Sequence, residues 1–210
     1  AYDTQYYLEV VSDHGVSQGT GWYTEGSEVT LSVPQVVEAG EGQRYVFESW
    51  NDANTSPLRT VILSQPTTFM ANYKTQYHVK ATSSYGATNV DGWWDEGSDV
   101  AITVPQLTDG QHGTRYVFAS WSDGDTSASR VVSLSQPTTL TADYTTQYYL
   151  TVESRWGDPQ GAGWYDSGST ASFSVASPVG MVVRHLMQEW GGDSSAASPA
   201  STILMDGPKL

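Results

Sequence analysis

The sequence predicts an all-β protein made of three tandem modules. Nearly the same phrase begins at Gly21 (GWYTEGSEVTLSVPQ), at Gly92 (GWWDEGSDVAITVPQ) and at Gly163 (GWYDSGSTASFSVAS). Most segments alternate apolar and polar residues, as strands do, and none presents an apolar face at helical spacing over several turns. We therefore expect small antiparallel, β-rich modules, either β-grasp-like or small β-sandwiches, joined into an elongated rod.

The repeat sets the module boundaries. Aligned without gaps, residues 4–74 and 75–145 are identical at 34 of 71 positions. The third copy starts at Thr146 and is more divergent, but its landmarks keep the same order. This period is longer than that of solenoid repeats, so each copy is expected to be a small domain. The predicted modules are residues 1–74, 75–145 and 146–210.

Four segments of each copy read as strands in turn. In the first copy they begin at Tyr6 (YYLEVV), Ser27 (SEVTLSV), Arg44 (RYVFESW) and Arg59 (RTVILS). Gly, Asn, Asp and Pro gather between them, as they do in turns, and a Gly-Ser pair leads into the second strand. A short helix over residues 34–42 is the less favoured alternative. With the segment that closes each copy, we expect about five strands per module.

The junctions between copies are residues 67–81 (TTFMANYKTQYHVKA) and 138–152 (TTLTADYTTQYYLTV). Neither contains Gly or Pro, whereas flexible and extended linkers are rich in these residues or in Ser. We therefore expect the last strand of one copy to run almost directly into the first strand of the next. Such a junction favours stiffness over loosely tethered domains.

The two ends of the sequence are out of phase with the repeat. Ala1–Asp3 matches the end of a last strand, and the third copy lacks the segment that closes the other two. One expectation is that the chain is an excised piece of a longer array. Another is that a strand from a neighbouring molecule completes the third copy, because an unpaired strand edge is a template for strand addition. A naturally truncated cap is the third.

Composition excludes several functions. The chain has 9 basic and 23 acidic side chains and a formal net charge of −14, so nucleic acid and anionic membranes are poor partners. It has no cysteine, which excludes disulfides and thiolate chemistry. No apolar run is long enough to insert into a membrane as a helix. No cofactor is expected.

The assembled pattern TQYYL…GxxxGxGWYxxGSxVxxSV…RYVFxxWxxD…MDGPKxL resembles the divergent InlB B-repeat class of bacterial and archaeal surface repeats. The resemblance covers all three copies, although the third departs at Ala176-Ser177 and at residues 185–187. It implies extracellular, non-enzymatic β-rich modules that occur in tandem in secreted or surface-anchored proteins. Expected partners are neighbouring repeats or copies of the same chain.

The repeated aromatic pairs are the candidate ligand site. Adjacent residues of a strand point to opposite faces, so one aromatic of each pair lies outside the main core. We expect the invariant tryptophans to be core residues and their neighbours, Tyr23, Trp94 and Tyr165, to form a repeated surface platform. Aromatic platforms suit the apolar faces of sugars, so the predicted ligand is a surface glycan. The alternative is that both sets only pack.

One candidate metal site occurs in the second copy. Asp123 and Asp125 in WSDGDTS have the spacing of many calcium loops, and a structural calcium ion is the cofactor to consider. The first copy has Asn54 at the place of the second acid, so the alternative is a turn stabilised by the aspartate side chain.

No catalytic constellation is predicted. The four histidines fall at four different repeat positions, and no metalloprotease, phosphate-binding or nucleophile-elbow motif occurs. The expected function is a non-enzymatic structural or spacer region of a secreted or cell-surface protein, such as a stalk, surface layer or fibre. The alternatives are an adhesin that uses the aromatic platform and a filament subunit joined by strand exchange.

Overall fold

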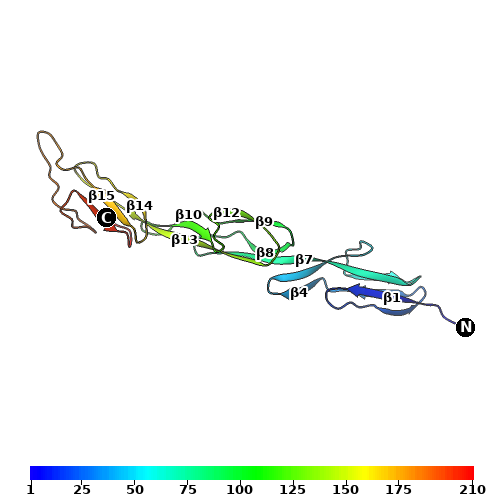
Figure 1. Cartoon of the computed structure of the whole chain (residues 1–210). Helices are drawn as coiled ribbons and strands as arrows, with labels where there is room; N and C mark the ends of the chain where they lie inside the picture. The colour runs from blue at the N-terminus through cyan, green and yellow to red at the C-terminus, as the bar shows by residue number, and fades with distance from the viewer. The chain divides into compact units, whose positions relative to one another are not determined.

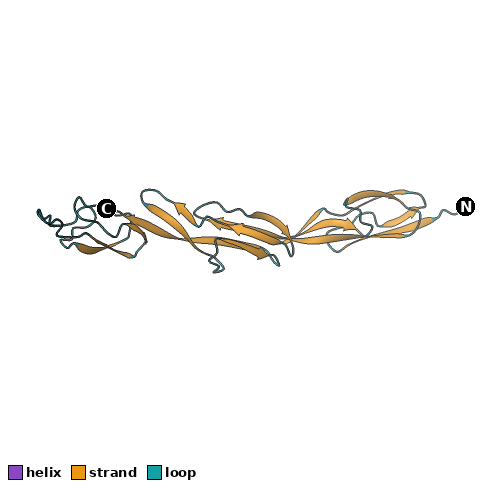
Figure 2. Cartoon of the chain, turned by 90° about the horizontal axis from the view of Figure 1, so that it is seen from above, coloured by secondary structure: helices purple, strands orange, loops and turns teal.

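A computed structural model describes residues 1–210 and contains strands and loops but no helix (Figure 2), which confirms the predicted all-β class. No segment forms a helix long and apolar enough to cross a membrane. The chain divides into two compact units, and the division runs through the second sequence repeat. The first unit is residues 1–80, 90–102 and 131–139, and the second is residues 81–89, 103–130 and 140–210.

The first unit contains the strands of the first repeat together with the first strands of the second repeat. These are β1 (Gln5–Ser12), β2 (Gly21–Thr24), β3 (Glu28–Ser32), β4 (Val36–Gly40), β5 (Gln43–Trp50), β6 (Leu58–Ile62), β7 (Thr67–Ser83), β8 (Asp91–Asp95) and β9 (Asp99–Thr103), of which β7 and β9 extend a few residues past the unit. β1 pairs with β2 and β7, β7 also pairs with β5 and β8, and β4 pairs with β5. β3 and β6 form a separate two-stranded sheet.

The core of the first repeat follows from the alternation of its strands. Leu8 and Val10 on β1 pack in one cluster with Leu31 on β3, Trp50 on β5 and Phe69 on β7, and all five are buried. Burying such a side chain contributes about 1.5–3 kcal/mol, so this cluster dominates the stability of the module. The indole Nε1 of Trp50 donates a hydrogen bond to the carbonyl oxygen of Ser56 at 2.8 Å, which satisfies its polar end.

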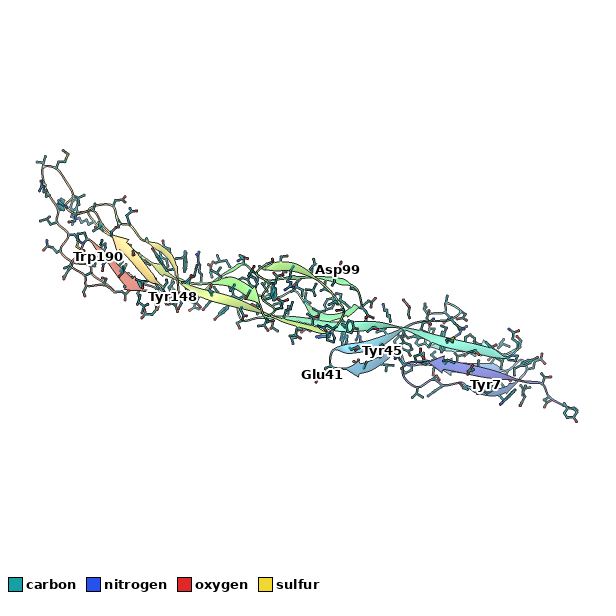
Figure 3. The ribbon with its side chains drawn as sticks, in the orientation of Figure 1. Tyr7, Glu41, Tyr45, Asp99, Tyr148 and Trp190 are labelled. Carbon is teal, nitrogen blue, oxygen red and sulfur yellow. The ribbon has the colours of Figure 1, made fainter.

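The second unit contains the remaining strands. These are β10 (Leu107–Asp109), β11 (Thr114–Trp121), β13 (Thr138–Leu150), β14 (Gly163–Asp166), β15 (Thr170–Ser174) and β16 (Ala200–Leu204), while β12 (Ser129–Ser133) pairs with β9. β11 pairs with β10 and β13, β13 with β14, and β15 with β16. In the third repeat a smaller core of Leu150, Ala171, Phe173 and Met205 is bordered by Tyr148 and Trp190 (Figure 3).

One expectation about the elements was wrong, and the less favoured alternative of a short helix does not occur. The sheets are not purely antiparallel, because β1 and β7 lie side by side and pair in parallel, from Leu8–Thr67 to Ser12–Ala71 (Figure 1). A parallel pair needs a long crossover, and the whole module between its first and last strands supplies one. The segment considered for a short helix is instead strand β4 with its turn into β5.

The expectation of continuous strands at the junctions is confirmed. β7 runs unbroken for 17 residues and β13 for 13, each through the boundary between two sequence repeats. The closing strand of one copy is therefore also the opening strand of the next.

Candidate functional site

The aromatic pairs face the opposite way from the prediction. Tyr23 packs against the core of the first repeat, and its hydroxyl donates a hydrogen bond to the Gly19 carbonyl oxygen at 3.0 Å. Tyr165 does the same in the third repeat, with its hydroxyl 2.7 Å from the Gly161 carbonyl oxygen. Trp22, which was expected in the core, is 66% exposed and lies against Tyr7, with the two ring centres 5.3 Å apart.

Tyr23, Trp94 and Tyr165 are therefore half-buried and do not form the fully exposed platform that was predicted. The three residues lie on β2, β8 and β14, and Trp94 is half-buried with its ring over Gly92, as the ring of Tyr23 lies over Gly21. The outward-facing members of the pairs are Trp22, Trp93 and Trp164. Two of these, Trp93 and Trp164, carry an arginine from the preceding repeat.

At the first junction, Arg44 of β5 stacks on Trp93 of β8. The guanidinium carbon lies 4.3 Å from the centre of the Trp93 ring, and Arg44 Nε donates a hydrogen bond to Gln76 Oε1 at 2.9 Å. Gln76 Nε2 in turn donates to Asp95 Oδ1 at 2.7 Å. Lys74 Nζ lies 2.8 Å from the other oxygen of Asp95, and this contact holds the pKa of Asp95 below its ordinary value.

The second junction repeats this chain of contacts. The guanidinium carbon of Arg115 lies 4.4 Å from the centre of the Trp164 ring, and its Nε donates to Gln147 Oε1 at 2.7 Å. Gln147 Nε2 donates to Asp166 Oδ1 at 2.8 Å. Thr145 stands where the first junction has a lysine. The same three polar residue types therefore bridge consecutive repeats twice.

The β4–β5 hairpin and the β10–β11 hairpin each pack the glycine at their turn closely against a proline. Gly42 has a φ of +76° and Gly113 a φ of +72°, which is the left-handed region. A Cβ on Gly42 would lie 2.8 Å from Pro137 Cβ, and one on Gly113 would lie 3.2 Å from Pro208 Cβ. Both glycine carbonyl oxygens accept a backbone hydrogen bond at 2.8 Å from the next repeat, the first from His78 and the second from Tyr149.

The structure does not support a calcium site at Asp123 and Asp125. Arg130 Nη1 lies 2.8 and 2.7 Å from the two carboxylate oxygens of Asp123. Asp125 Oδ1 accepts a hydrogen bond from the backbone N–H of Ser127 at 2.7 Å, as expected for the alternative turn. No third acidic or histidine ligand joins them. In the first repeat Asp52 and Arg59 form the equivalent pair at 2.7 Å.

The histidines lie in two ring stacks, an ion pair and a turn. His14 stacks on Tyr45 with ring centres 3.5 Å apart, and His185 stacks on Trp156 at 3.8 Å. His78 Nε2 lies 3.0 Å from Asp91 Oδ1, and His112 has a φ of +52° in the β10–β11 turn.

The sequence interpretation missed the junction residues. Arg44 with Arg115, and Gln76 with Gln147, recur at one repeat period, but they were assigned to strands without a role. Their recurrence at one repeat period was the available signal.

Comparisons of this chain with family models, with curated proteins and with solved structures gave no match.

Proposed function

We propose that this chain is a non-enzymatic structural region, a spacer whose tandem modules are held in a fixed relation by their junctions. The observation that carries the proposal is that two junctions use the same contacts. Each has an uninterrupted shared strand, an arginine stacked on a tryptophan, and a glycine hairpin tip against a proline. A repeated ligand site would instead leave these side chains free.

The physical argument concerns how little freedom such a junction leaves. The backbone dihedral angles of a strand that pairs on both edges are fixed, unlike those of a flexible linker. Bending the junction must therefore break hydrogen bonds of the sheet. Each arginine–tryptophan stack adds about 0.5–1 kcal/mol where it is exposed to solvent. These terms favour a semi-rigid rod over freely jointed domains.

The proposed location is secreted or cell-surface, which rests on the resemblance to the divergent InlB B-repeat class. A glycan-binding platform is not proposed, because Tyr23 and Tyr165 pack inward and two of the outward tryptophans are covered by arginine.

Distance measurements between spin labels test the spacer function. The chain has no native cysteine, so Glu48→Cys and Ala119→Cys place one label at equivalent exposed positions on β5 and β11. We expect one narrow distance distribution that broadens when Arg44→Ala and Trp93→Ala are added. The matched control is Trp22→Ala, which removes a tryptophan that carries no arginine and should leave the distribution narrow. A broad distribution in the unmodified background would overturn the proposal.

A further inference from the structure

Asn54 carries a modification motif that no other asparagine of the chain has. The sequence contains four asparagines, at positions 51, 54, 72 and 89, and only Asn54 is followed two positions later by Ser or Thr. The triplet Asn54-Thr55-Ser56 is the acceptor pattern for attachment of a glycan to the asparagine amide. Such triplets also arise by chance, so the surroundings of Asn54 decide whether it is an acceptor.

The triplet lies in an exposed loop of defined shape. Residues 51–57 connect β5 to β6, and residues 51–56 are all exposed. Arg59 Nη1 lies 2.8 and 2.7 Å from the two carboxylate oxygens of Asp52. The backbone N–H of Trp50 donates a hydrogen bond to the Asn54 carbonyl oxygen at 2.8 Å. These contacts hold the backbone on both sides of Asn54 and leave its side chain in solvent.

The side chain of Asn54 uses its oxygen but not its nitrogen. Oδ1 accepts a hydrogen bond from the backbone N–H of Ser56 at 2.9 Å, which forms an Asx turn. The backbone N–H of Asn54 donates to Asp52 Oδ1 at 3.2 Å. Nδ2, which has two hydrogens to donate, has no hydrogen-bond partner. The nitrogen that would receive a glycan is therefore both exposed and free.

The second repeat shows that the turn does not require an amide. Asp125 takes the place of Asn54, and its Oδ1 accepts a hydrogen bond from the Ser127 N–H at 2.7 Å. The Asp125 carbonyl oxygen accepts the Trp121 N–H at 2.7 Å, which is the counterpart of the Trp50 contact. The turn thus accounts for the side-chain oxygen of Asn54 and leaves its NH₂ group without a structural role.

The loop is well separated from the contacts that join the repeats. β5 begins next to the hairpin tip that carries Glu41 and Gly42, and it ends at Trp50 (Figure 3). At about 3.3 Å per residue, its 8 residues span about 25 Å. A saccharide on Asn54 therefore leaves the contact of Gly42 with Pro137 unobstructed.

We propose that Asn54 is an acceptor for an N-linked glycan, an inference that rests on the secreted or cell-surface location proposed above. The donor class is a saccharide whose anomeric carbon is joined to a lipid diphosphate. A bond forms between Asn54 Nδ2 and that carbon. The bond from the carbon to the phosphate oxygen breaks, and its electron pair stays on the leaving lipid diphosphate. Nδ2 gives one proton to a carboxylate of the transferase.

Secretion of the full chain, behind a cleavable signal, from a eukaryotic cell that N-glycosylates its exported proteins tests this inference. The purified chain is weighed by mass spectrometry before and after an amidase removes N-linked glycans and leaves aspartate at each modified position. We expect one glycan per modified chain and conversion of Asn54 alone. Asn54→Asp, which gives the loop the residue of the second repeat, should abolish the modification while the chain stays folded.

The reciprocal variant is the matched control. Asp125→Asn gives the second repeat the same acceptor triplet in the same turn, so it should add a second glycan. An unmodified Asn54 in the secreted chain would refute the inference, whether or not the Asp125→Asn chain gains a glycan. The spin-label distances are measured on the chain without glycan, so failure of the spacer function and failure of this inference are distinguishable.

Pro57 should limit the extent of the modification. Proline restricts the residue before it, here Ser56, to extended conformations, and this limits how the triplet fits a transferase. The second repeat has Ala128 at this place, and its carbonyl oxygen accepts the Val104 N–H at 3.0 Å. The Pro57 carbonyl oxygen accepts the Val33 N–H at the same distance, 3.0 Å. Pro57→Ala should therefore keep the loop and raise the fraction of chains that carry the glycan.

Discussion

Gly42 and Gly113 combine two constraints that are separable by mutation. Each has a positive φ, and each lies against a proline of the following repeat. Gly97 has nearly the same φ, +77°, but no atom lies within 4 Å of the point where a Cβ would stand, so this glycine carries the backbone constraint alone.

We therefore expect Gly42→Ala to destabilise the chain more than Gly97→Ala. The control should cost about 1 kcal/mol for the left-handed conformation, and Gly42→Ala that amount plus about 1–2 kcal/mol for the displaced proline. Urea unfolding of both variants measures the difference. Equal losses would mean that the proline contact is unimportant.

The aspartate–arginine pairs predict a pH dependence. Hydrogen bonds from Arg59 and Arg130 hold the pKa values of Asp52 and Asp123 below their ordinary value of 3.8. Because the folded pKa is lowered, the stabilisation is complete above the unfolded value and is lost as the pH falls through the folded value.

Stability should thus decline below about pH 4, and Asp52→Asn with Asp123→Asn should make this decline shallower. Unfolding free energies measured from pH 7 to pH 2 test this expectation. Arg59→Gln with Arg130→Gln should flatten the curve in the same range. An unchanged pH profile in both double variants would count against the pairs.

At the scale of single residues, the sequence indicated that the aromatic pair splits between two faces but not which member faces inward. Alternation is symmetric with respect to the two faces of a strand. What decides the outcome for Trp93 is Arg44, which lies 49 residues earlier and is brought to it by the β5–β7 pairing. A local pattern carries no trace of such a partner.

Among the elements, β5 contributes the largest buried side chain of the first repeat, and this gives a third prediction. Trp50 is 1% exposed, whereas Trp22 on β2 is 66% exposed. Trp50→Ala should cost about 3–5 kcal/mol by opening a cavity, and Trp22→Ala less than about 1 kcal/mol. Thermal or urea unfolding compares the two variants, and a similar loss for both would contradict this account of the core.

The positions of the strands were largely predictable, but their pairing was not. Period-two alternation and turn residues locate β1, β3, β5 and β6, and the lack of Gly and Pro anticipates the uninterrupted β7 and β13. The parallel pairing of β1 with β7 leaves no mark on either strand, because alternation is the same in parallel and antiparallel ladders.

At the scale of the whole chain, the net charge of −14 and the repeat period determined the class of function that could be expected. They could not show where the compact units divide. The first two copies are the most similar in sequence, yet the division falls within the second one. The contacts that define a unit cross the repeat boundaries through the shared strands β7 and β13. A sequence alignment of the repeats places a boundary within each of these strands.

The parallel pairing of β1 and β7 has a mechanical consequence. When a module is pulled between the start of its first strand and the exit of its last, two adjacent parallel strands slide past one another in shear. The hydrogen bonds between residues 8–12 and residues 67–71 must then yield together instead of opening one after another. We therefore expect modules pulled in series to unfold one at a time, each at the force that breaks its parallel strand pair.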